Sequence, residues 1–184
     1  MQTSAIYGES GYERIERDAY YTPAWCTETL LRHVEFEGLV WECAAGNGQM
    51  SEVLVAAGLD VRTSDIEPIS PVTISLDYLN DVMPWDISHV VTNPPYAQAQ
   101  AFIERALEDT QSNAGKVAML LRNEYDSAKT RAHLFGDCPQ FALKLVLTKR
   151  PKWFADDKAS PRHNFSWFVW GWAHEGPAEI RWDQ

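Results

Sequence analysis

The sequence predicts an α/β protein with a doubly wound, mostly parallel sheet. Short apolar segments, typical of strands, alternate with longer amphipathic segments, typical of helices, along most of the 184 residues. The last two strand-like segments, 141–148 and 164–173, have only a polar loop between them, at 149–163. Without a helix to cross the sheet, we expect these two strands to form an antiparallel pair.

The first half of the chain is predicted to contain two helices and three strands. Residues 1–19 are polar and show no clear period, so we expect an N-terminal arm. Thr22 and Pro23 are typical of a helix start, as N-cap and first-turn residue, and Gly38 ends this helix. The elements that follow are a strand at 39–43, a helix at 49–57, a strand at 59–66 and a weaker strand at 72–76.

The second half continues the alternation. A buried strand at 89–92 is followed by a turn and by a helix at 98–111. A strongly apolar strand at 116–122 and a helix at 127–135 come next. With the two final strands, the sequence therefore predicts seven strands, with helices on both faces of the sheet.

The charge of the chain is unevenly distributed. The net charge is −10, which argues at first against nucleic-acid binding. Residues 1–114 carry a net charge of −13, however, and residues 115–163 a net charge of +5. Lys149, Arg150 and Lys152 lie in this basic block. The block is either a solvated face or a contact surface for a polyanion such as DNA.

Cysteine usage and hydropathy indicate a cytoplasmic protein. The chain has an odd number of cysteines, and they lie far apart in sequence, at Cys26, Cys43 and Cys138. Neither a disulfide framework nor a metal site is therefore expected. No stretch approaches the roughly 18 apolar residues that a membrane span needs. The first residues also lack the basic and apolar pattern of a signal peptide, so we expect no membrane association.

A small-residue loop and three strand-end acids predict a nucleoside site. Gly46 and Gly48 follow the strand at 39–43, which carries Glu42 near its end, and they permit close approach of a ligand to the main chain. The loop lacks the Lys-Ser/Thr of a phosphate-binding P-loop. Asp65 lies at the end of the second strand, where ribose hydroxyls are held, and Asp77 follows the third strand. A positively charged nucleoside without phosphates, such as S-adenosylmethionine, suits this set of carboxylates better than a dinucleotide.

The turn after the strand at 89–92 is suited to hold an amino group. An Asn before Pro presents its side-chain carbonyl beside a main-chain carbonyl, and two prolines make the turn stiff and rich in acceptors. An aromatic ring follows directly. Such a turn is either an ordinary turn at the end of a strand or a binding site for a planar group that bears –NH2. Its residues are Asn93, Pro94, Pro95 and Tyr96.

Together these segments resemble the class I S-adenosylmethionine-dependent DNA adenine-N6 methyltransferases, with small phage and prophage members most similar. The resemblance runs from about Tyr20 to Trp170 and includes the Tyr-Thr-Pro segment at 21–23. It implies one Rossmann-like domain over residues 20–184, without a separate target-recognition domain, in a bacterial or phage-infected cell. Asn-Pro-Pro-Tyr also occurs in glutamine-N5 protein methyltransferases and some RNA methyltransferases, so RNA, a protein glutamine and an inactive binding module remain alternatives.

The resemblance also implies roles for individual residues. Asn93 to Tyr96 would hold the target adenine, with Tyr96 stacked on it, and Phe165 is the candidate for its other face, although core packing is the commoner role of such a ring. Lys149, Arg150 and Lys152 would contact DNA. The residues expected to hold S-adenosylmethionine are Tyr21, Thr22, Pro23, Glu42, Ala44, Gly46, Asp65, Ile66, Asp77, Tyr78 and Asn93.

Overall fold

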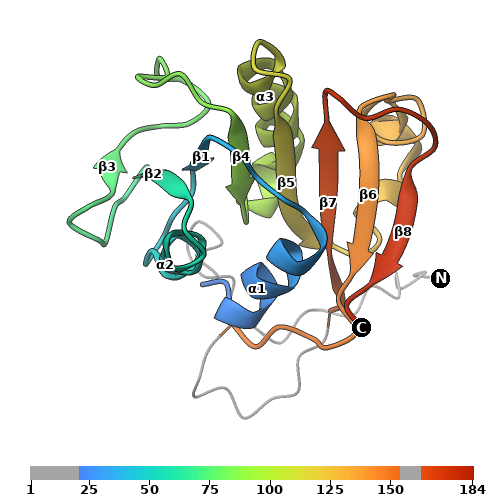
Figure 1. Ribbon diagram of the computed structural model, residues 1–184, viewed down its shortest axis with the longest axis horizontal. Helices are drawn as coiled ribbons and strands as arrows, with labels where there is room; N and C mark the ends of the chain where they lie inside the picture. Colours follow the sequence, from blue (N-terminus) through green and yellow to red (C-terminus); the bar gives the residue numbers. More distant parts are fainter. Residues whose placement is uncertain (1–20, 154–162) are drawn as a thin grey trace, which may run out of the picture.

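An eight-stranded mixed sheet forms the centre of the computed structural model, which describes residues 21–153 and 163–184 (Figure 1). The strand order is β3-β2-β1-β4-β5-β7-β6-β8. Strand β7 runs antiparallel to both of its neighbours, β5 and β6, and the other pairings are parallel. The strands are β1 Leu39–Glu42, β2 Asp60–Asp65, β3 Ile74–Ser75, β4 His89–Thr92, β5 Lys116–Arg122, β6 Phe141–Val146, β7 Phe165–Gly171 and β8 Glu179–Trp182.

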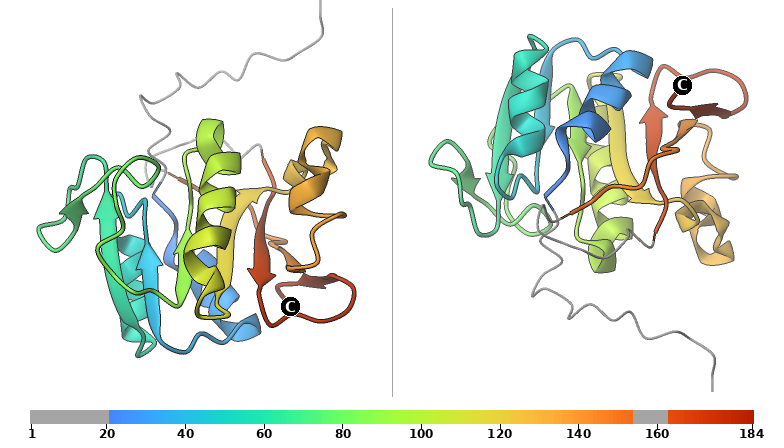
Figure 2. Two further views of the ribbon diagram at one scale, coloured as in Figure 1. Left: turned by 90° about the horizontal axis from the view of Figure 1, so that it is seen from above. Right: turned by 90° about the horizontal axis from the view of Figure 1, so that it is seen from below.

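Helices cover both faces of the sheet, as predicted (Figure 2). Helices α1 (Ala24–His33) and α2 (Gln49–Ala56) lie on one face, and α3 (Ala99–Gln111) and the 3-10 helix η4 (Lys129–Leu134) lie on the other. Successive residues of a strand point to opposite faces of the sheet and so pack against different helices. Val40 packs with α1 and α2, whereas its neighbour Trp41 packs with α3. Among the residues described here, no helix has the length and apolar character needed to span a bilayer.

Two predicted elements differ from the structure, and one strand was not predicted. The third strand is shorter than the predicted 72–76, because only Ile74 and Ser75 pair with β2. In place of the predicted helix at 127–135, the structure has two 3-10 helices, η3 (Tyr125–Ser127) and η4. They are joined by a hydrogen bond that the Arg131 side chain donates to the Tyr125 carbonyl (2.8 Å). The eighth strand, β8, was not predicted, because its four residues are all exposed and show no buried face.

Both ends of α1 also depart from the prediction, since the helix ends at His33 and not at Gly38. Thr22 was expected to be the N-cap, but Pro23 occupies that position and no side chain caps the helix. Thr22 is instead buried beside the loop that follows β1. The predicted N-terminal arm, 1–19, lies outside the described residues.

The strand order brings the ends of several strands to one edge of the sheet. From β1 the chain continues to β2 and β3 on one side, and β4 and β5 lie on the other, so the order reverses between β1 and β4. In open α/β sheets, ligands bind beyond the carboxyl ends of the strands at such a reversal. Because β5 and β6 both pair antiparallel with β7, β6 ends at this same edge, where β7 begins (Figure 1).

We expect Gly115→Ala to destabilise the fold. A Cβ at Gly115 would lie 1.7 Å from the main-chain oxygen of Ser88, so the turn before β5 would have to move. The free energy of unfolding, measured by urea titration, should fall by about 1–3 kcal/mol. Gly136→Ala is the matched control, because no atom outside its immediate neighbours lies within 4 Å of the added Cβ. Equal stability of the two variants would contradict the prediction.

Candidate active site

A cavity of about 570 Å³ opens at the carboxyl edge of the sheet, at the reversal between β1 and β4. Its volume is in the range of small-molecule sites. All but one of the residues predicted to hold the cofactor line it, and Pro23 is the exception. The lining residues among them are Tyr21, Thr22, Glu42, Ala44, Gly46, Asp65, Ile66, Asp77, Tyr78 and Asn93.

The loop between β1 and α2 forms the floor of this cavity. Gly46 and Gly48 have φ values of +52° and +83°, which side chains other than glycine rarely adopt. The ring of Tyr21 lies directly over Gly46, since a Cβ there would be 3.4 Å from two of its carbons. Tyr21 and the glycine loop, which are separated in sequence by the whole of α1 and β1, therefore lie against each other.

The Asp65 carboxylate joins two loops of the cavity. Its Oδ2 accepts a hydrogen bond from the Gly46 N–H (2.8 Å), and its Oδ1 accepts one from the Glu67 N–H (2.9 Å). A carboxylate has about four acceptor positions, so further donors can still bind to it. Asp65 thus shapes the cavity and offers a negative charge to a ligand.

Glu42 is buried at the end of β1, with only 2% of its surface exposed. The Ser51 hydroxyl, from the first turn of α2, donates a hydrogen bond to its carboxylate. Burial disfavours the charged form and raises the pKa of Glu42 from 4.5 to about 8, although the Ser51 hydrogen bond acts in the opposite direction. In this structure Glu42 is therefore mainly neutral at pH 7.

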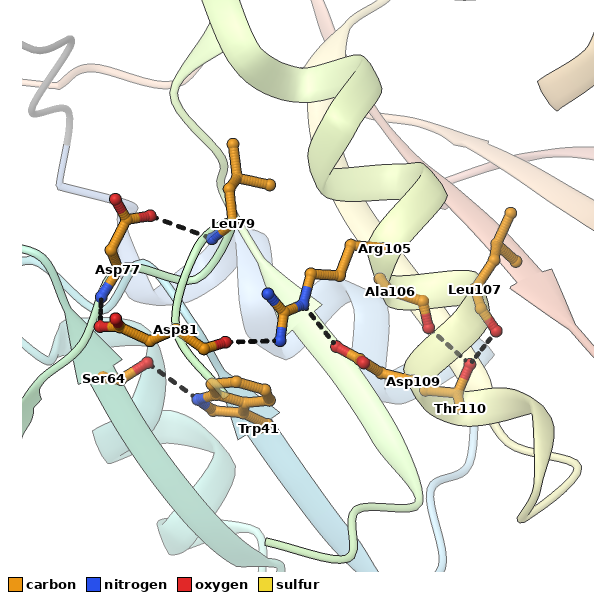
Figure 3. A network of polar contacts seen from close by, with 10 residues as sticks. All are labelled: Trp41, Ser64, Asp77, Leu79, Asp81, Arg105, Ala106, Leu107, Asp109 and Thr110. Carbon is orange, nitrogen blue, oxygen red and sulfur yellow. Dashed lines mark hydrogen bonds and ion pairs between the residues drawn. The ribbon is translucent and has the colours of Figure 1, made fainter. Parts of the chain in front are cut away.

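Asp77 is held in a tight turn after β3. Its carboxylate accepts hydrogen bonds from the Asn80 side-chain amide (2.8 Å) and the Leu79 N–H (3.0 Å), and these bonds, led by that from Asn80, lower the pKa of Asp77. The turn is anchored to α3 by Arg105, which donates to the Asp81 carbonyl (2.9 Å) and lies 3.4 Å from the Asp109 carboxylate (Figure 3).

The ring of Tyr78 belongs to the core more than to the cavity. It is 2% exposed, packs edge-on against Trp41 (5.0 Å between centroids) and lies 4.8 Å from Phe102. Tyr78 therefore contributes little surface to the cavity and mainly supports the cavity wall from within the core. Ile66 and Ile69 form an exposed apolar wall of the cavity. Ile66 was predicted to be part of the site, but Ile69 was not, because an isolated aliphatic residue in a loop carries no periodic signal.

The turn after β4 brings Asn93 into the same cavity. Asn93 and Pro95 line it, and Tyr96 begins the 3-10 helix η2 (Tyr96–Gln98) beside it. The Tyr96 ring packs against Phe165 at the start of β7, with centroids 5.9 Å apart and an interplanar angle of 36°. Trp153 meets the same Phe165 ring edge-on at 4.9 Å.

This packing changes the interpretation of Phe165. Its side chain is 2% exposed and lies between Tyr96 and Trp153, so it supports Tyr96 from within the core. A direct contact with a target base would require this packing to open. Trp153, which is half-buried, lies on the outer side of the cluster.

Exposed cations follow β6 at the same edge of the sheet. Lys149, Arg150 and Lys152 are exposed, as a contact surface for a polyanion requires. Lys144 belongs to the same block in sequence but not in space, because it forms an ion pair with Asp126 (2.7 Å) and lies over the Phe168 ring. The remaining cations of the block's loop, Lys158 and Arg162, fall outside the described residues.

Comparison with known proteins identifies the fold. No protein-family model and no curated sequence matches the chain. Solved structures do match. A Listeria monocytogenes protein assigned to the class I S-adenosylmethionine-dependent methyltransferases is 13% identical (TM-score 0.60; 91% of this chain, 66% of the other). The type I restriction-modification methyltransferase subunit of Streptococcus thermophilus is 11% identical (TM-score 0.56; 83% of this chain, 45% of the other). The 23S rRNA methyltransferase ErmE is 18% identical (TM-score 0.55; 86% of this chain, 72% of the other).

These likenesses establish that the chain has the Rossmann-like fold of S-adenosylmethionine-dependent methyltransferases. The chain spans between 45% and 72% of the length of these three structures. At 11–18% identity the fold is what they share with it, and the chemistry has to be argued from the residues of the cavity.

Glu42 should make stability depend on pH. Its pKa is raised in the folded protein, so the folded state holds this proton between about pH 4.5 and 8 while the unfolded state releases it. The contribution is complete below pH 4.5 and is lost as the pH rises through 8. Urea unfolding at several pH values should show this loss in the native protein and its absence in Glu42→Gln, which keeps an acceptor for Ser51. Parallel pH profiles of the two proteins would refute the raised pKa.

Proposed function

We propose that the chain transfers a methyl group from S-adenosylmethionine to the N6 amino group of adenine in DNA. The observation that carries this proposal is the position of Asn93, a residue that lines the same cavity as Asp65 and the glycine loop. An acceptor turn for an amino group and a nucleoside cavity thus form one continuous site. The fold is consistent with this chemistry, and one structural neighbour is a methyltransferase subunit of a restriction-modification system.

The residues of the cavity fit S-adenosylmethionine. Asp65 would accept the ribose hydroxyls, Asp77 would accept from the adenine amino group, and Ile66 and Ile69 provide an exposed apolar surface for the purine. Tyr21 and Thr22 would lie near the methionine end, with Glu42 at the end of β1. When bound, the cofactor supplies an electrophilic methyl group on a positively charged sulfur.

The turn after β4 would activate the acceptor nitrogen. The lone pair of an exocyclic amine is delocalised into the base, so the amine is a weak nucleophile. The Asn93 side-chain oxygen and the Pro94 carbonyl would accept hydrogen bonds from its two N–H groups and stabilise the positive charge that forms on nitrogen. The fixed turn also orients the amine, which lowers the entropic cost of reaction.

Tyr96 would stack on a target base turned out of the duplex, which costs a few kcal/mol. Lys149, Arg150 and Lys152, exposed at the same edge, would contact phosphates of the strand. RNA is the second candidate acceptor, because ErmE, which matches over 86% of this chain, acts on 23S rRNA. Mass spectrometry of nucleosides from DNA and RNA incubated with protein and cofactor would show which polymer gains N6-methyladenine.

We expect Asn93→Ala to lower methyl transfer to DNA by roughly 10²-fold or more, because one of the two acceptors for the amino group is lost. Labelled cofactor and DNA give the rate, and calorimetry should show cofactor affinity largely unchanged. Gln100→Ala, on the exposed side of α3, is the control and should retain activity. Native turnover by Asn93→Ala would refute the assignment.

Asp65→Ala should weaken S-adenosylmethionine binding by roughly tenfold or more, since a charged hydrogen-bond acceptor and the anchor of the Gly46 loop are both removed. Isothermal titration calorimetry gives the affinity. Asp60→Ala removes a carboxylate from the other end of β2 and should leave the affinity unchanged. Equal affinity of the native protein and Asp65→Ala would count against a ribose contact.

A further inference from the structure

An aromatic ring at the start of α1 and a lysine that follows β6 lie against each other. Lys149 Nζ lies 5.1 Å from the centre of the Trp25 ring, in the geometry of a cation–π contact. Trp25 belongs to the first turn of α1, and Lys149 follows β6, so the contact joins segments more than a hundred residues apart. We propose that Trp25 and Lys149 together form a phosphate-binding subsite for the nucleotide next to the target base, with Trp25 as the residue that positions Lys149.

The Trp25 ring is fixed well enough to position another group. It packs against the core cluster that contains Leu147 and Trp167. The start of α1 is tied to β7, because the Trp167 indole N–H donates to the Cys26 carbonyl (2.8 Å). Trp25 is therefore held on one side by the core, and its other side carries the ammonium group of Lys149.

Because the Trp25 ring carries no net charge, its contact with Lys149 leaves the positive charge of Lys149 available to a phosphate. Elsewhere in the fold Lys144 pairs with Asp126 (2.7 Å) and Arg181 with Glu179 (2.7 Å), so these cations are neutralised. Within residues 21–153 and 163–184, Lys149 forms no ion pair. The nearby carboxylate of Asp183 accepts a hydrogen bond from the Thr148 hydroxyl (2.6 Å).

The subsite is connected directly to the residues around the target base. The Leu147 N–H, two positions before Lys149, donates to the Phe165 carbonyl (3.1 Å), and the Phe165 ring supports Tyr96. Arg150 extends from the same segment, where its Nε donates to the Asn164 side-chain oxygen (2.8 Å). A strand whose base stacks on Tyr96 would thus have its neighbouring phosphate near Lys149. This inference rests on the proposed function in one respect, namely that the acceptor is a nucleic acid.

The test is the salt dependence of binding to a fluorescein-labelled single-stranded oligodeoxynucleotide with one central adenine, followed by anisotropy. Loss of one phosphate contact should reduce the slope of log affinity against log salt by about 0.7, the value for single strands. We expect this reduction for Lys149→Gln. Arg62→Gln removes the same charge from an exposed position on β2, which four other strands separate from β6 in the sheet, and should leave the slope unchanged. An unchanged slope for Lys149→Gln would overturn the subsite.

The role of Trp25 is tested by a double-mutant cycle. Trp25→Leu should lower affinity about two- to fivefold in the native background, as expected for an exposed cation–π contact, and should have no further effect when Lys149 is already Gln. Trp25→Phe, which keeps an aromatic ring, should restore most of the loss. An equal effect of Trp25→Leu in both backgrounds would show that Trp25 does not act through Lys149.

Binding and methylation are measured separately, so the two proposals can fail independently. A reduced slope for Lys149→Gln, without any methyl transfer to DNA by the native protein, would support the subsite and refute the proposed reaction. Methyl transfer to DNA with an unchanged slope would refute the subsite alone. A slope change seen only with an oligoribonucleotide of the same sequence would support the subsite and refute DNA as the acceptor.

Discussion

The pair of hydrogen bonds accepted by Asp65 is the constraint on which the site depends. One oxygen holds the Gly46 N–H and the other holds the Glu67 N–H, so the loop after β1 and the turn after β2 are fixed to one carboxylate. The position of Tyr21 follows from this, because its ring rests on Gly46. The end of β2 thus sets the shape of a cavity whose walls come from five separate segments.

Electrostatics divide the carboxyl edge into two regions. The cavity contains Asp65 and Asp77, with Glu42 held neutral by burial, and this environment favours a ligand that carries positive charge. The exposed cations after β6 form the other region, which favours a polyanion. A protein with a net charge of −10 can therefore present a basic surface, because its acidic residues are concentrated before residue 115. Overall charge is a poor guide to partners when the two signs are segregated in this way.

Much of the fold was predictable because its central strands are buried on both faces. The predicted strands 89–92 and 116–122 match β4 and β5, whose continuous apolar runs leave no ambiguity. Strand β8 could not be predicted, since all of its residues are exposed. That Asp65, Gly46 and Asn93 line one cavity could be anticipated, because strand ends of a parallel sheet meet at one edge. The burial of Glu42 and Tyr78 was not predictable, because it results from packing between segments distant in sequence, whereas core packing was already the commoner role expected of a ring such as Phe165.

The single reversed strand has a consequence for how such a protein can diversify. Because β7 is antiparallel to β5 and β6, β6 leaves the sheet and β7 enters it at the same edge, where β4 and β5 also end. The Leu147 N–H already joins the two strands at the base of this connection. Doubling the length of a closed loop costs only about 0.6 kcal/mol in chain entropy. Segments of different length and sequence can thus be exchanged at this position while the cavity lined by Asp65 and Gly46 and the sheet stay as they are.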